Sequence, residues 1–212
     1  MEYCEEGQLD QWLAVQRQAV SDDVMENLFR FSRDIAHGMQ YLASKKIVHN
    51  RLAARNIFLK AVMEVRIAGF GSEVNEDDGS HEQSEEKKTA RIPIKWAAPE
   101  VLMNKRGTEK SDVWSYGIVL WEIFSMGRPT AVFQHAFCRP WPKILGGYRM
   151  DKPEFCDDIH YQVMRDCWQH KPNKRPTFHT IHSTLSKQFT NRTDAGFYYD
   201  TSGIENALNK KR

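Results

Sequence analysis

The side chains best suited to chemistry lie in one short run, Val48-His-Asn-Arg-Leu-Ala-Ala-Arg-Asn-Ile57. His49 could act as a general base, and the amide oxygen of Asn56 could contribute to a site for a hard metal ion. Arg51 and Arg55 stay protonated at any accessible pH and accept no hydrogen bond, so neither can remove a proton. The plainer interpretation is a packed histidine at position 49 and a backbone-capping amide at position 56. We favour that interpretation for both residues.

The four cysteines form neither a metal motif nor a disulfide framework. Cys4, Cys138, Cys156 and Cys167 lack the C-x-x-C spacing and close histidine partners of a zinc site. Four cysteines in 212 residues are also sparse for a disulfide scaffold, and the acidic first residues do not resemble a secretion signal. We therefore expect a cytosolic chain, or a cytosolic piece of a longer one, that binds no metal.

The composition is that of a soluble globular domain. Lys and Arg (30) nearly balance Asp and Glu (28), which gives a net charge of +2, and 41% of residues are hydrophobic. This balance gives no general reason to expect nucleic acid or an anionic membrane as a partner. A membrane span needs about 18 apolar residues in a row. The longest apolar run, 116–124, is short and contains Glu122, so no span is expected.

Hydrophobic spacing predicts several amphipathic helices. Apolar residues recur at intervals of three, four and seven between Met25 and Leu42, which marks one buried face of a helix that starts near Asp23. Ser111 and Asp112 open a second, more apolar helix. Two further helices are expected near 158–169 and 176–189.

Shorter segments predict strands and loops. The apolar runs 47–48, 56–59 and 65–68 are β-branched and too short for helices, so they indicate short strands and turns. Residues 71–91 contain seven carboxylates among small polar residues, and we expect a mobile surface loop there. The fold class predicted from these patterns is mainly α with short β strands.

Five motifs together resemble a known family. The run at 48–57 is followed by Val65-Arg-Ile-Ala-Gly-Phe-Gly71, Ile92-Pro-Ile-Lys-Trp-Ala-Ala-Pro-Glu100, Ser111-Asp-Val-Trp-Ser-Tyr-Gly117 and Lys174-Arg-Pro-Thr-Phe178. In this order they resemble the large C-terminal lobe of a receptor-type protein tyrosine kinase. Two further stretches, 38–46 and 147–153, look especially like fibroblast-growth-factor-receptor kinases.

The resemblance implies a partial kinase domain over residues 1–189 and a polar tail over 190–212. Within the domain, residues 1–7 match the hinge between the two kinase lobes, and residues 69–100 match the activation segment. No G-x-G-x-x-G and no V-A-I-K-type lysine occur in the sequence. We therefore expect the small N-terminal lobe to be missing, together with its cover over the nucleotide phosphates.

The resemblance also implies that the catalytic base is lost. Where the family has H-R-D, this chain has His49-Asn50-Arg51. The base must accept the proton of the substrate hydroxyl, and an arginine cannot do so. Loss of a general base typically costs about 10²–10⁴-fold in rate. Arg55 and Asn56 are retained, but only as parts of a degenerate catalytic loop.

The metal and nucleotide positions are degenerate in the same way. Where the family has D-F-G, this chain has Gly69-Phe70-Gly71, so the carboxylate that anchors the metals is absent. Asn56 alone is a poor site for Mg²⁺, which is usually held by carboxylates. Phe58 matches the floor of the adenine site, and with Gly69–Gly71 it is a remnant of that site. We expect no intact catalytic, cofactor or metal residue, and no ATP or Mg²⁺.

What the resemblance preserves is the structural frame. Glu100 and Arg175 match a buried ion pair that fixes the activation segment, and Asp112 matches the residue that holds the catalytic-loop backbone. His49 and Phe70 match two stacked members of the core. We expect these residues to maintain the fold.

Regulation is expected to differ from that of an active kinase. The segment 71–99 has no tyrosine, and Asn50 stands where an arginine would bind an activating phosphate. In the tail, Tyr198 and Tyr199 are exposed candidates for phosphorylation and for recognition by arginine-lined pockets.

The sequence therefore predicts a catalytically inactive, pseudokinase-like domain that binds or scaffolds a protein partner. The partner would be an active kinase or a phosphotyrosine-binding protein, and not nucleic acid. The expected location is the cytoplasm, either alone or as the cytoplasmic portion of a longer membrane receptor. Two alternatives stay open. One is a fragment of a longer receptor kinase with weak activity, which would use ATP and Mg²⁺, and the other is a truncated, non-functional gene product.

Overall fold

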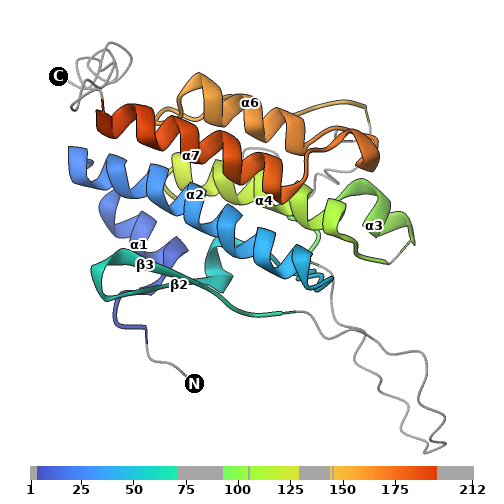
Figure 1. The fold of residues 1–212 in the computed structure, drawn as a ribbon, viewed down its shortest axis with the longest axis horizontal. Helices are drawn as coiled ribbons and strands as arrows, with labels where there is room; N and C mark the ends of the chain where they lie inside the picture. The colour runs from blue at the N-terminus through green and yellow to red at the C-terminus, as the bar shows by residue number, and fades with distance from the viewer. Residues whose placement is uncertain (1–3, 71–92, 105, 129–143, 145, 195–212) are drawn as a thin grey trace, which may run out of the picture.

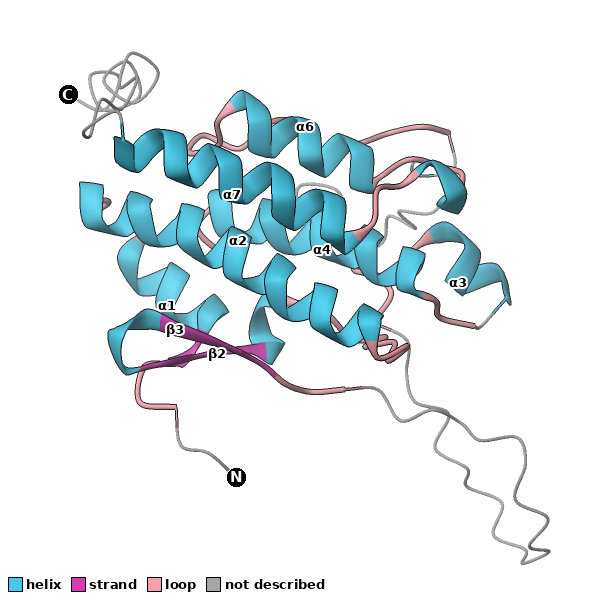
Figure 2. Cartoon of the chain, viewed as in Figure 1, coloured by secondary structure: helices cyan, strands magenta, loops and turns pink. Residues whose placement is uncertain are grey.

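The computed structural model describes residues 4–70, 93–104, 106–128, 144 and 146–194. The predicted fold class is confirmed, because long helices make up most of the described structure and one small sheet lies beside them (Figures 1 and 2). The expected acidic loop at 71–91 and the tail tyrosines Tyr198 and Tyr199 lie outside the described residues. The helices are α1 (Leu9–Gln16), α2 (Asp22–Ser44), α3 (Pro99–Asn104), α4 (Glu109–Phe124), α6 (Asp158–Cys167) and α7 (Phe178–Asp194), and the strands are β1 (Gly7–Gln8), β2 (Ile57–Lys60) and β3 (Glu64–Ile67).

The longest helix, α2, lies alongside α7 (Figure 1). Its first residue is Asp22, and its N-cap is Ser21, whose side chain accepts a hydrogen bond from the backbone N–H of Val24 at 3.3 Å. The cap Ser21 therefore lies two residues before Asp23, near which the sequence predicted the start of the helix. The predicted face is buried, and Leu28 and Ile35 on it are fully enclosed.

Helix α4 is the centre of the core. Thr108 and Ser111 cap it reciprocally, so it begins at Glu109, two residues before the predicted start. Of its 16 residues, 12 are buried, as expected for a helix surrounded by other elements. Gly117 is required there, because a Cβ at this position would lie 2.6 Å from Trp168 Nε1.

The small sheet lies at one side of the helices, next to α1 (Figure 2). Its strand order is β1-β2-β3 and both pairs are antiparallel, with Ile57 opposite Ile67. The predicted runs 56–59 and 65–68 form β2 and β3 to within one residue. The run 47–48 forms no strand. The predicted helix near 158–169 is α6, and the one near 176–189 is α7, which continues to Asp194.

The turn between β2 and β3 contains a strained residue. Val62 has φ 62° and ψ 21°, in the left-handed region, and its side chain is 86% exposed. The left-handed conformation costs most residues about 1–2 kcal/mol, whereas asparagine tolerates it better. Val62→Asn should therefore raise the free energy of unfolding by about 1 kcal/mol. Urea denaturation of the two proteins would measure the difference.

A suitable control is Val15→Asn. Val15 is also exposed (67%), but it lies within helix α1, where asparagine brings no conformational benefit. Equal effects of the two substitutions would show that the more polar exposed side chain, and not relief of backbone strain at Val62, explains any gain.

Candidate functional site

A buried carboxylate of α4 holds the first residues of the catalytic-loop segment, residues 49–56, by hydrogen bonds to their backbone. Asp112 Oδ2 accepts the N–H of His49 at 2.6 Å, and Oδ1 accepts the N–H of Asn50 at 2.9 Å. Asp112 is 1% exposed, and this burial raises its pKa to about 6 although the two hydrogen bonds favour the ionised form. The fixed backbone allows Asn50 to adopt a positive φ of 65°.

A second carboxylate of α4 holds the other end of the same segment. Glu122 Oε2 accepts the N–H of Ala54 at 3.0 Å and the indole N–H of Trp96 at 2.9 Å. Burial of the carboxyl group raises the pKa of Glu122 to about 7. Sequence analysis did not predict this role. The signal was present, because Glu122 is the one charged residue of the apolar run 116–124.

His49 is a packed histidine whose two ring nitrogens are both engaged. Nδ1 accepts the N–H of Arg51 at 3.2 Å, so Nε2 must carry the hydrogen that is donated to the carbonyl of Ala68 at 3.0 Å. The ring lies 4.6 Å from that of Phe70. The side chain is fully enclosed, and burial lowers its pKa. This geometry leaves His49 no free nitrogen for proton transfer to a substrate.

Positions 51 and 69 lie on either side of Asn56. The Asn56 amide Nδ2 donates to the carbonyl of Arg51 at 2.6 Å. Gly69 has φ +73°, and a Cβ at that position would lie 2.6 Å from Asn56 Oδ1. The amide thus occupies space next to the glycine where a side chain would begin. Across the described parts of the chain, no three His, Cys, Asp or Glu side chains are grouped so that they could hold a metal ion.

The other arginine of this segment, Arg55, is engaged with an aromatic ring. Its guanidinium carbon lies 4.0 Å from the ring centroid of Trp96, a geometry typical of a cation–π contact. Arg51 is exposed at the surface. At position 51 the segment therefore presents a cation where the resemblance would require a carboxylate.

Phe58 and Phe70, which the resemblance assigns to the adenine and D-F-G positions, lie near the small sheet. Phe58 is on β2, opposite Gln8 of β1, and is half-buried. Phe70 follows β3 and is 45% exposed, although one side of its ring contacts His49.

Glu100 and Arg175 form a two-point ion pair between α3 and the segment before α7. Arg175 Nη1 and Nη2 donate to the two carboxylate oxygens of Glu100 at 2.6 and 2.8 Å. The same guanidinium donates to the carbonyls of Gln169 and Lys110 at 2.9 and 2.8 Å. Arg175 is 3% exposed, so its charge depends on these partners.

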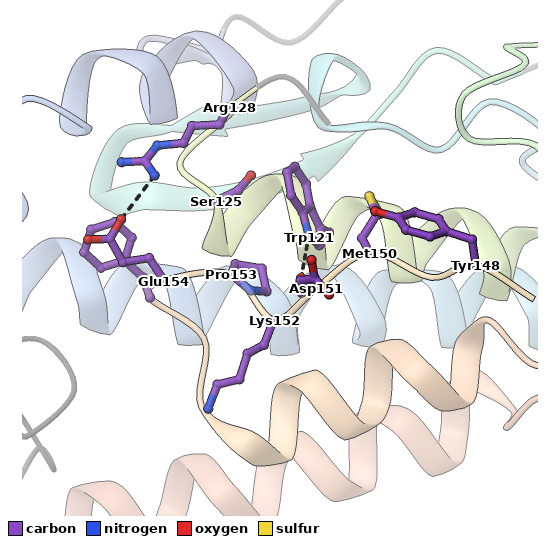
Figure 3. Close-up of a pocket in the computed structure, with 10 residues that line it drawn as sticks. Trp121, Ser125, Arg128, Tyr148, Met150, Asp151, Lys152, Pro153 and Glu154 are labelled. Atoms are coloured by element: carbon purple, nitrogen blue, oxygen red, sulfur yellow. Dashed lines mark hydrogen bonds and ion pairs between the residues drawn. The ribbon is translucent and has the colours of Figure 1, made fainter. Parts of the chain in front are cut away.

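A cavity of about 220 Å³ lies at the C-terminal end of α4 (Figure 3). Arg128 and Glu154 form an ion pair of 3.1 Å at one end of it, and the indole N–H of Trp121 donates to the carbonyl of Asp151 at 3.1 Å. No residue of the segment 49–56 lines this cavity, so it is separate from the candidate site. Its lining consists of Trp121, Ser125, Arg128, Tyr148, Met150, Asp151, Lys152, Pro153, Glu154 and Phe155.

The fold and the motifs of the site are those of a protein kinase, and sequence comparison identifies the family. A model of the protein tyrosine and serine/threonine kinase family matches residues 1–185, so the chain belongs to this family. The three short strands described here fit a partial kinase fold without the full small lobe.

The curated relatives include receptor tyrosine kinases. The chain is 40% identical over 168 residues to the mast/stem cell growth factor receptor Kit of Takifugu rubripes, and 43% identical over 157 residues to the vascular endothelial growth factor receptor 1 of Gallus gallus. It is 36% identical over 203 residues to the fibroblast growth factor receptor 1 of Pleurodeles waltl. These matches cover 79%, 73% and 88% of this chain.

The chain spans only a small part of each relative, namely 17%, 12% and 24% of their lengths. It therefore corresponds to part of a tyrosine kinase domain of these receptors. Within the residues that the structure describes, no helix has the length and apolar character needed to cross a bilayer.

Proposed function

We propose that this chain is a catalytically inactive, tyrosine-kinase-like domain that acts by binding or scaffolding a signalling protein. The observation that carries the proposal is the environment of Asn56. The loop backbone around it is held in place by Asp112 and Glu122, yet the two neighbouring positions for carboxylates are Arg51 and Gly69.

These two positions affect different parts of phosphoryl transfer. At position 51, a permanently protonated guanidinium replaces the group that accepts the substrate proton. At position 69, no carboxylate is available for the Mg²⁺ ions that neutralise the transferring phosphate. Neither defect depends on which residues precede Met1, because both lie in the large lobe.

The retained frame supports a binding role. The Glu100–Arg175 pair and the Asp112 contacts keep the lobe organised without serving chemistry. We propose a protein partner, either an active kinase or a phosphotyrosine-binding protein that recognises Tyr198 or Tyr199. We also propose a cytoplasmic location, alone or as part of a longer receptor. In support of that location, the described cysteines Cys4, Cys156 and Cys167 are free thiols.

The catalytic part of the proposal can be tested by restoring the two carboxylates. The chain would be fused to the small lobe of an active receptor tyrosine kinase, and transfer of labelled phosphate from ATP and Mg²⁺ to a tyrosine peptide would be measured. The wild-type fusion should show no transfer above an Asn56→Ala control. The Arg51→Asp, Gly69→Asp double variant should gain at least about 10²-fold over wild type, the lower range expected for one general base.

If the wild-type fusion transfers phosphate and Asn56→Ala abolishes this transfer, the proposal is contradicted and a weakly active receptor-kinase fragment is favoured. The same result in the unfused chain would contradict the proposal more directly. Absence of a protease-resistant core in the unfused chain would instead favour a non-functional product, because a folded lobe resists digestion.

A further inference from the structure

Two histidine rings are stacked where α2 and α7 lie side by side (Figure 1). The ring of His37 on α2 lies against the ring of His182 on α7, with centroids 4.7 Å apart and planes 18° from parallel. Further along the same two helices, the guanidinium of Arg33 lies 4.2 Å over the ring of Phe189. The helices are therefore antiparallel, and the stacked pair joins them away from the catalytic-loop segment.

The groups around the stacked pair are mostly positive when charged. Arg33 lies one helical turn before His37 and is always charged, and His179 lies one turn before His182. Burial lowers the pKa of His182 below its ordinary value of 6.5, and these neighbours lower it further. Asp34 acts in the opposite direction, but its carboxylate is already paired with Arg33 at 2.7 Å.

The stacked geometry makes the number of protons on the pair important. Two neutral rings stack favourably at this distance. Whichever ring takes the first proton, a second proton places two like charges 4.7 Å apart. This holds for either tautomer of each ring, because the rings contact each other through their faces and not through a shared hydrogen bond. The doubly protonated pair therefore pushes the two helices apart.

We propose that the stacked pair of His37 and His182 is an acid-sensitive contact, which weakens the packing of α7 on α2 when both rings are protonated. In the unfolded chain the rings are apart, so they take up both protons more readily than in the folded chain. The folded state thus binds fewer protons below about pH 6.5, and the contribution of the pair to stability falls as pH falls. Glu122 responds in the opposite direction, because its raised pKa favours the folded state at acidic pH.

A double-mutant cycle in the full 212-residue chain isolates this contact from all other titrating groups. Urea denaturation of wild type, His37→Gln, His182→Gln and the double variant would be measured at about pH 7.5 and about pH 5. At low ionic strength, the pair's contribution to the ratio of folded to unfolded chains should fall by about fourfold or more. Two unit charges 4.7 Å apart give a change of this size even at the dielectric constant of water.

Salt and a second cycle serve as controls. In 1 M salt, where the Debye length is about 3 Å, most of the fall should disappear. A cycle of His37→Gln with His170→Gln should show no coupling at either pH, because His170 is exposed and has no described contact with His37. Coupling between His37 and His182 that is equal at both pH values would overturn the proposal. A fall that persists unchanged in 1 M salt would also overturn it.

The wild-type chain decides the proposal if a variant does not fold. NMR of the histidine rings during a pH titration should show that the stacked pair takes up its two protons in two separated steps, as coupled sites do. Uptake of both protons in one common step, as expected for independent rings, would overturn the proposal.

Discussion

Glu100→Ala is expected to lower the free energy of unfolding by about 3–5 kcal/mol, because it leaves a buried arginine without its countercharge. Arg175 is 3% exposed, and both of its terminal nitrogens bind Glu100. Its remaining partners are backbone carbonyls, which cannot balance a full positive charge. The side chain of Glu100 is itself 19% exposed, which places the expected loss at the lower end of this range. Chemical denaturation monitored by tryptophan fluorescence would measure the loss.

The matched control is an ion pair of the same length at the surface. Lys152 and Asp158 lie 2.6 Å apart, but their side chains are 40% and 94% exposed. Because exposed pairs contribute about 0–1 kcal/mol, Lys152→Ala should have a small effect. Similar losses in Lys152→Ala and Glu100→Ala would refute the claim that burial makes the Glu100–Arg175 pair important.

The second large effect concerns Glu122 and appears as a dependence on pH. Its pKa is about 7 in the folded chain, against an ordinary value of 4.5. Between these values the folded state binds more protons than the unfolded state, so stability falls as pH rises. The stabilisation of the folded state that comes from the raised pKa of Glu122 is fully present below about pH 4.5 and is lost above about pH 7. A difference of this size corresponds to roughly 3 kcal/mol, at about 1.36 kcal/mol per pKa unit.

Comparison with Glu122→Gln isolates this contribution, because all other titrating groups are shared. Relative to Glu122→Gln, wild type should lose about 3 kcal/mol of stability between pH 4.5 and 7.5. Glutamine retains an oxygen that can accept from Ala54 and Trp96. Leucine has no such oxygen, so Glu122→Leu should be less stable than Glu122→Gln at every pH. The stability of the two variants should depend on pH in the same way. If the free energies of unfolding of wild type and Glu122→Gln differ by the same amount across this range, protonation of Glu122 does not contribute to stability.

The helices were predictable from sequence because their apolar spacing is strong. The periodicity between Met25 and Leu42 identified α2, and its exact start depended on whether Ser21 or Asp23 supplies the cap. Three-dimensional contacts decide such choices, because both residues are good caps. The short helix α3 was not predicted, since six residues carry too little periodic signal.

At the candidate site, residue types were easier to predict than their connections. The replacements at positions 51 and 69 are visible in the sequence itself, and they raise the question of activity directly. The apolar run 116–124 marks Glu122 as unusual, but its partner Ala54 lies 68 positions away, and no local pattern indicates that pairing. The contact of Ser32 with His160 spans 128 positions and was missed for the same reason. Burial also decides the behaviour of His49, whose ring nitrogens are both occupied by backbone groups.

The contact between Gly69 and Asn56 has a consequence for how this site can change over time. Because the amide already fills the space beside the glycine, a mutation that returned a carboxylate to position 69 would first meet a clash and a strained positive φ. It would also disrupt the bond from Asn56 to Arg51, so it would lower stability before any benefit to a metal could arise. A carboxylate at position 69 alone would thus cost stability without restoring transfer, because position 51 would still lack the base; only the two carboxylates together would restore both parts of the site. For single mutations, the loss of the carboxylate at position 69 therefore behaves as a one-way step.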